Sequence, residues 1–148
     1  MELSPEALDA LVTGHMRFLS NSGYLYEKAH TKSNELLGSY LECSYCNTKL
    51  GISLEMNLFL ANNPGTRDVL VFHLSRGNKT FSLTEYLKYA GASEAQIEEI
   101  GLYAQQGSLD QRVEKVLSSA ASHLQGELLG VVNGEEWIDV PIDWGDYK

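Results

Sequence analysis

The order of apolar and polar residues changes its period along this chain. Apolar side chains recur at helical spacing from Leu8 to Leu19, after a Ser-Pro-Glu start that is typical of a helix N-terminus. From Tyr24 to Leu74 apolar and polar residues alternate instead, with the period of a strand that buries one face. The pattern predicts a helix from about Pro5 to Ser20 that is followed by a β-sheet.

The alternating region divides into short segments joined by short connections. Candidate strands are Tyr24 to Ala29, Tyr40 to Tyr45, Ile52 to Leu58 and Val69 to Leu74. The last of these is apolar enough to lie inside the sheet, and Cys46 is expected in the turn that follows the second. Because short connections cannot make crossovers, we expect an antiparallel sheet of roughly three to five strands.

Three helix-start signatures follow the sheet, at Ser82, Ser93 and Ser108. In each, Glu or Gln stands three residues after the serine, so the two side chains can satisfy backbone donors reciprocally. The third predicted helix has apolar residues at helical spacing from Leu109 to Leu128. It is expected to be the main element packed on the sheet.

The last segment, Val131 to Trp144, again alternates apolar residues with acids and begins with an Asn-Gly turn. Pro141 favours an edge or irregular strand over a central one. The chain as a whole predicts a single α+β domain over residues 1–148. It comprises an N-terminal helix, an antiparallel sheet, a three-helix segment and an extended C-terminal tail against the core.

Charge is distributed unevenly along the 148 residues. The range 94–148 contains eleven acids and three bases, whereas residues 1–93 contain nine acids and eight bases. The net charge of the whole chain is -9. This balance argues against binding to nucleic acid or to an anionic membrane, because both need clustered Lys and Arg. A basic protein is the complementary partner.

The start of the chain lacks the basic and apolar pattern of a secretory signal, and no apolar run approaches the ~18 residues of a bilayer span. Two cysteines, separated by two residues, offer no disulfide framework. We therefore expect a cytoplasmic protein.

Cys43 and Cys46 have the C-x-x-C spacing of half a zinc knuckle, and His30 and His73 could complete four ligands. No second C-x-x-C or paired histidine motif is present. Small apolar thiols at a strand end are the favoured interpretation, so no cofactor is predicted. A small zinc-binding domain or metal-dependent hydrolase remains the alternative.

Catalytic motifs are absent from the sequence: there is no G-x-S-x-G elbow and no glycine-rich phosphate loop. We therefore predict a protein that is not an enzyme. The C-terminal tail instead interleaves aromatic residues with acids, as binding hot spots often do. The predicted partner-binding residues are Glu135, Glu136, Trp137, Asp139, Asp143, Trp144 and Asp146.

These features favour a small acidic binding protein. In its general profile of small size, acidity and missing catalytic signature, the chain resembles bacterial toxin-immunity proteins. That resemblance implies an antitoxin-type inhibitor that occludes the active site of a basic toxin domain, such as a nuclease. A structural subunit of a homo-oligomer, joined through the Trp-rich tail, is a further alternative.

Overall fold

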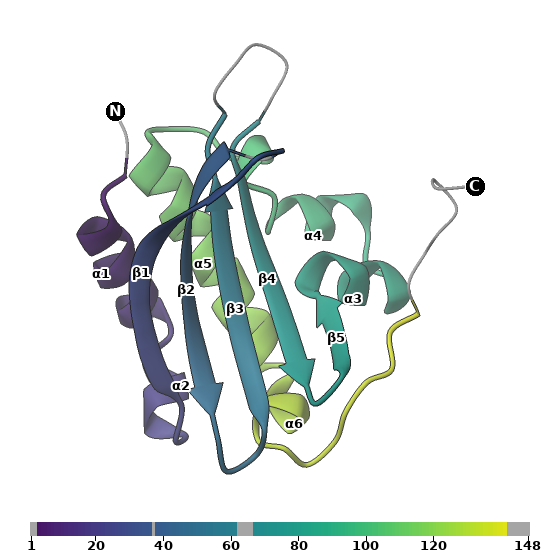
Figure 1. Ribbon diagram of the computed structural model, residues 1–148. Helices are drawn as coiled ribbons and strands as arrows, with labels where there is room; N and C mark the ends of the chain where they lie inside the picture. Colours follow the sequence, from purple (N-terminus) through teal and green to yellow (C-terminus); the bar gives the residue numbers. More distant parts are fainter. Residues whose placement is uncertain (1–2, 37, 62–66, 142–148) are drawn as a thin grey trace.

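In the described part of the chain, five strands form one antiparallel sheet in sequence order. The computed structural model in Figure 1 describes residues 3–36, 38–61 and 67–141. The strands are β1 (Leu25–Asn34), β2 (Gly38–Asn47), β3 (Ile52–Phe59), β4 (Val69–Arg76) and β5 (Lys79–Ser82). The predicted antiparallel sheet is confirmed, and β4 lies inside it, between β3 and β5.

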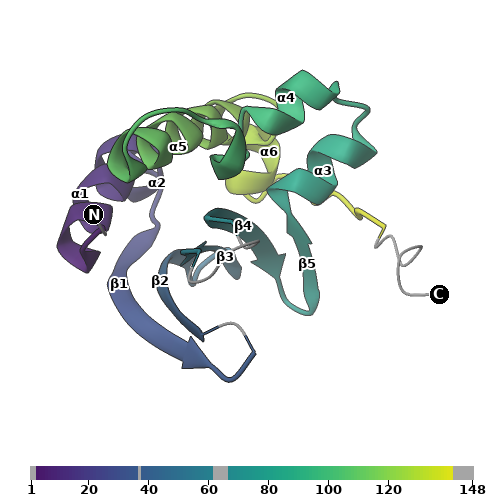
Figure 2. The same cartoon turned by 90° about the horizontal axis from the view of Figure 1, so that it is seen from above.

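Helices cover one side of this sheet, as Figures 1 and 2 show. They are α1 (Pro5–His15), α2 (Arg17–Asn21), α3 (Leu83–Tyr89), α4 (Glu94–Glu98), the 3-10 turn η1 (Leu102–Ala104), α5 (Leu109–Gln125) and α6 (Leu129–Val132). No described helix or loop crosses the other side in these views, and we call that side the open face. Among the described residues, no helix is long and apolar enough to cross a membrane.

The core lies between the sheet and the helices and forms one cluster of buried side chains. The long helix α5 supplies its central stripe, where Val113, Val116, Leu117 and Ala120 are completely buried. All three predicted capping boxes are present, at the starts of α3, α4 and α5. The α+β architecture expected from the sequence is therefore confirmed.

A bulge in β1 joins the first helix to the sheet. Glu27 pairs with Ser44 on β2, but the next aligned residue is His30, so two residues of β1 oppose one of β2. The N–H of Ala29, inside this bulge, donates to Asp9 Oδ1 of α1 at 2.7 Å. The same carboxylate oxygen accepts from the Tyr26 hydroxyl at 2.5 Å. A side chain of α1 thus accepts the hydrogen bond of a backbone N–H group in the bulge.

Two boundaries predicted near the N-terminus are wrong. The single helix expected over Pro5 to Ser20 is broken at Met16, whose φ of -107° and ψ of 23° are not helical. Thr13, Gly14 and His15, which are poor helix formers, precede the break. Strand β2 also extends through Asn47, so Cys46 lies in the strand and not in the turn.

The C-terminal region departs further from the prediction. Helix α5 ends at Gln125 instead of near Leu128, and the short helix α6 occupies part of the segment predicted to be extended. The N–H groups of Glu135 and Glu136 both donate to the Gly130 carbonyl, which ends α6 in a tight turn. The described residues 133–141 form no strand. They pack on the core through side chains, as the predicted tail was expected to do.

Candidate functional site

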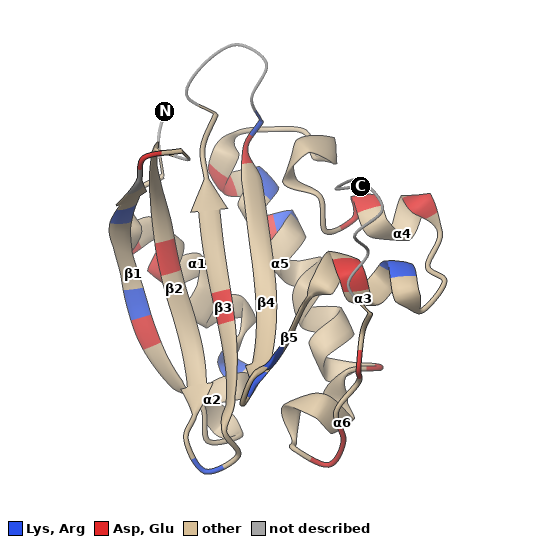
Figure 3. Cartoon of the chain, turned by 45° about the vertical axis from the view of Figure 1, so that its right-hand side comes forward, with Lys and Arg blue, Asp and Glu red and all other residues tan. Residues whose placement is uncertain are grey.

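Exposed acids gather on the side of the molecule beyond β5. Figure 3 shows acidic positions of α3, α4 and the segment after α6 on this side. We define the acidic edge by the exposed carboxylates Glu94, Glu98, Glu99, Glu127, Glu135, Glu136 and Asp139. Two of them, Glu127 and Glu136, are near enough to Tyr86 of α3 to raise its pKa, although burial is the larger cause. Glu127, which follows α5, and Glu136 of the tail therefore lie on one surface, near α3.

The partner-binding residues predicted in the tail differ in their surroundings. Glu135 and Glu136 are exposed, as a docking role requires. Trp137 is instead half-buried, with its ring centroid 5.1 Å from that of Phe81 on β5. Asp139 forms an exposed ion pair with Lys79, at 3.0 Å between Nζ and Oδ1. Trp137 therefore attaches the tail to the sheet, and the acids surround that attachment.

Three other predicted partner-binding residues, Asp143, Trp144 and Asp146, lie outside the described residues.

The four residues proposed for zinc are not brought together. Cys43 is buried on the helix side of β2, whereas the exposed Cys46 is three residues further along the strand and lies on the open face. His30 on β1 and His73 on β4 are separated by β2 and β3. Among the described residues, no group of three or more His, Cys, Asp and Glu side chains could hold a metal ion. Burial raises the pKa of the Cys43 thiol to about 11.

The open face carries a second group of acids that sequence analysis did not single out. Glu42 on β2 lies opposite His30 of β1 and Asn57 of β3. Glu55 on β3 lies opposite Ser44 of β2 and His73 of β4. The two glutamates are diagonal neighbours on adjacent strands, a position from which long side chains can meet.

Glu42 is the most heavily bonded member of this group. Its side chain is only 15% exposed, and Oε2 lies 2.6 Å from Lys32 Nζ and 3.5 Å from His30 Nε2. Its carboxyl group also hydrogen bonds with that of Glu55, which lowers the pKa of Glu42, with Lys32 adding to the effect. The same bond, together with burial, raises the pKa of Glu55. Two neighbouring carboxyl groups disfavour simultaneous ionisation, so Glu55 is the member of the pair that protonates first as the pH falls.

Asn57 completes the group, which we call the open-face cluster: Glu42, Glu55 and Asn57. Asn57 is only 8% exposed, although no described helix covers its side of the sheet. Its side chain hydrogen bonds with Glu55 and works against the rise in the pKa of that residue. Its Oδ1 atom is buried and has no hydrogen-bond partner.

The open-face cluster could have been anticipated from the turn between β2 and β3. Asn47 pairs with Ile52 across this turn. Counting back in an antiparallel register from that pair sets Glu42 opposite Asn57 and places Glu55 beside them. A turn placed correctly would thus have brought both glutamates onto one face.

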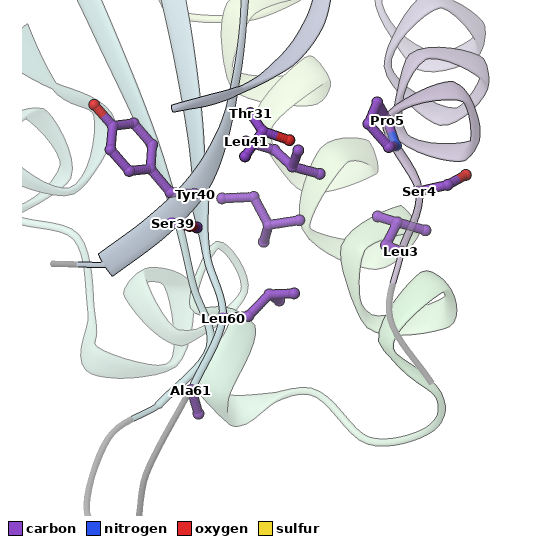
Figure 4. A pocket seen from close by; sticks show the side chains of 10 residues that line it. Leu3, Ser4, Pro5, Thr31, Ser39, Tyr40, Leu41, Leu60 and Ala61 are labelled. Atoms are coloured by element: carbon purple, nitrogen blue, oxygen red, sulfur yellow. The ribbon is translucent and has the colours of Figure 1, made fainter. Parts of the chain in front are cut away.

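A cavity of about 900 Å³ opens between the start of α1 and the ends of β1, β2 and β3 (Figure 4). Leucines 3, 41, 58 and 60 supply much of its wall, with hydroxyl groups from Ser4, Thr31 and Ser39. The Ser4 hydroxyl is already engaged, because it accepts from the Ala7 N–H to cap α1. Among the described residues no acid or base lines the cavity, so these residues offer apolar contact and no evident chemistry.

No family model, curated protein or solved structure matches this chain. Its function must therefore be inferred from its own residues, and the acidic edge and the open-face cluster are the two surfaces from which to do so.

Proposed function

We propose that this protein is a non-enzymatic binding protein that docks a basic protein through its acidic edge. The observation that carries the proposal is the concentration of exposed carboxylates on α4 and the tail. The nearby bases are few, and Lys79 is already paired with Asp139. Carboxylates crowded on one side create a field that attracts and orients a cationic surface.

Apolar side chains on the helices that adjoin these elements in the chain support docking. Tyr89 on α3 is 57% exposed and Leu129 on α6 is 42% exposed. A docked protein would remove both from water, which adds affinity to the electrostatic attraction. Sequence analysis gave the anchoring role to Trp137 and Trp144. The ring of Trp137 packs on Phe81 and Trp144 lies outside the described residues, so we assign the role to Tyr89 and Leu129.

The most concrete form of this function is an antitoxin-type inhibitor. A nuclease active site binds phosphates with lysines and arginines, and a row of carboxylates can occupy the same positions. Inhibition would follow from occlusion of that site. It requires no chemical step by the inhibitor, which fits a chain whose sequence holds no assembled catalytic motif.

The test compares two triple variants of equal charge. The first is Glu135→Gln, Glu136→Gln and Asp139→Asn; the control is Glu6→Gln, Glu27→Gln and Glu35→Gln, at exposed positions outside the edge. Proteins captured from a lysate of the native host are purified, and their association rates with each variant are measured over a range of salt concentrations. A partner docked at the edge should associate about tenfold more slowly with the first triple, and within about twofold of the wild type with the control.

The outcome against the proposal is equally clear. If every captured protein binds both triples alike, or at a rate insensitive to salt, docking at the acidic edge is wrong.

A further inference from the structure

In the open-face cluster both cationic contacts go to one of the two glutamates. Lys32 Nζ lies 2.6 Å from Glu42 Oε2, and His30 Nε2 lies 3.5 Å from the same oxygen. Glu55 forms no ion pair of its own among the described residues and bonds to the Glu42 carboxyl group instead. Two adjacent carboxylates repel each other unless a cation or a proton stands between them. The space beside Glu55 is therefore a place where a cation fits.

Asn57 supplies an independent sign of a binding site. Asn57 is more than nine-tenths buried, and it faces Glu42 directly across the strand pair. The Oδ1 atom has no donor within the described residues. A buried acceptor without a donor is costly, so native proteins seldom leave one in place without a reason. A ligand with several N–H groups would satisfy this oxygen and the carboxylates together.

Two aromatic rings form a wall beside these acceptors. Tyr40 is two residues before Glu42 on β2, and Phe59 is two residues after Asn57 on β3. Both rings therefore lie on the same face of the sheet as the cluster. The two rings stack, with centroids 4.7 Å apart and planes inclined by 29°. A flat cation can lie against such rings, where the ring quadrupole attracts it.

We propose that Glu42, Glu55 and Asn57 form a binding site for a guanidinium group, carried either by a small molecule or by an arginine side chain. A guanidinium is planar and presents five N–H donors in a fixed fork, which matches two carboxylates and an amide oxygen. An ammonium group has no flat face and fewer donors. Binding competes with protonation of Glu55: the guanidinium enters, and a protonated Glu55 releases its proton to solvent.

The rim of the site consists of side chains that can move. Lys32 and His30, from the edge strand β1, are about half exposed and contact Glu42 from one side. The other titratable groups facing the site are Glu27 on β1, which accepts from Ser44, Tyr40 on β2 and His73 on β4, which lies opposite Glu55. Rotation of Lys32 and His30 would open a path to the buried oxygens. The ligand would then occupy the space that the side chains of Lys32 and His30 partly cover.

This inference does not depend on the proposed docking at the acidic edge. The cluster lies on β2 and β3, whereas the edge lies beyond β5, so each can fail alone.

The test uses the whole chain and ethylguanidinium chloride as the probe, with matched potassium chloride as the salt control. Titration calorimetry and the side-chain NMR signals of Glu42, Glu55 and Asn57 report binding. We expect one probe per chain and a loss of affinity of at least about tenfold in Glu55→Gln, which removes a carboxylate but keeps the side-chain shape. Glu6→Gln, an equal charge change at an exposed position of α1 on the helix side of the sheet, should leave the affinity within about twofold.

Proton release gives a readout that needs no variant. Binding should weaken as the pH falls, because protons compete for Glu55. In the wild type the probe should lower the pH at which the Glu55 carboxyl signal titrates. Calorimetry in buffers of different ionisation enthalpy should detect a released proton.

Further probes separate the two sources of the guanidinium group. A short peptide with a central arginine should bind more tightly than ethylguanidinium if the natural ligand is a protein segment, and less tightly if it is a small molecule. Ethylammonium binding as tightly as ethylguanidinium would overturn the proposed ligand class. An unchanged Glu55 titration, or equal affinity in Glu55→Gln and wild type, would overturn the site.

Discussion

The acids of this protein occupy two very different environments. On the acidic edge, Glu135, Glu136 and Asp139 are exposed, and the ion pair of Asp139 with Lys79 is exposed as well. On the open face, Glu42 is largely screened from water and bonds to Glu55, which lowers the pKa of Glu42 and raises that of Glu55. The first group acts through the sum of its charges, and the second through specific contacts.

This difference shows that a count of charges locates only one kind of acidic site. Exposed carboxylates cost the fold little and act over a distance that salt limits. Buried carboxyl groups have to find partners within the fold, and an incomplete set of partners is itself informative. The eleven acids after residue 93 therefore drew attention to the edge, whereas two ordinary glutamates form the more specific site.

The largest expected effect tests what holds the acidic edge in place. Trp137→Ala removes the contact with the Phe81 ring, which is 5.1 Å away between centroids. We expect a loss of about 2–3 kcal/mol in the free energy of unfolding, below the 3–5 kcal/mol typical of fully buried aromatic residues. Urea denaturation measures this loss.

Trp137→Phe is the control, because it keeps a ring at the same position. It should lose less than half as much stability. If Trp137→Ala were neutral, the tail would not depend on this contact, and the acidic edge would have no fixed shape.

A smaller effect contrasts one glutamate from each environment. Glu42→Gln removes the charge that Lys32 and His30 contact, and we expect it to cost about 1–2 kcal/mol of unfolding free energy. Glu135→Gln makes the same change on the exposed edge and should stay within about 0.5 kcal/mol of the wild type. Urea is the denaturant of choice for both, since guanidinium would bind the proposed site. Equal costs would mean that the two environments do not differ in energy.

Local signals in the sequence were sufficient for much of the fold. Each of the capping boxes that begin at Ser82, Ser93 and Ser108 spans only four consecutive residues. The sequence alone was therefore sufficient to place three helix starts. Period-two alternation likewise identified β2 and β3. Features that depend on distant residues were missed.

The tail and the open-face cluster show why those features were missed. Residues of the tail alternate as a strand would, but the Gly130 carbonyl captures two of their N–H groups and Trp137 packs on Phe81, far back in the sequence. These contacts override the local pattern. The cluster likewise exists only once β2 and β3 are in register, and neither glutamate has a distinctive local sequence.

The smallest effect concerns how stability depends on pH. Bonding to Glu42, followed by burial, raises the pKa of Glu55 in the folded state above its ordinary value of 4.5. A raised pKa means that this group stabilises the fold below that value and that the contribution is lost as the pH rises through the folded pKa. Glu42, whose pKa is lowered, contributes in the opposite sense and loses its contribution as the pH falls through its folded pKa.

Glu55→Gln isolates the first of these contributions, because a glutamine amide mimics the protonated carboxyl at every pH. The variant should therefore gain stability relative to the wild type as the pH rises from mildly acidic to neutral, whereas the curve of Glu135→Gln, a variant of the exposed edge, should stay parallel to that of the wild type. Urea denaturation at a series of pH values measures both curves. Parallel curves for wild type and Glu55→Gln would show that Glu55 titrates as an exposed acid does, and the open face would then be no different from the acidic edge.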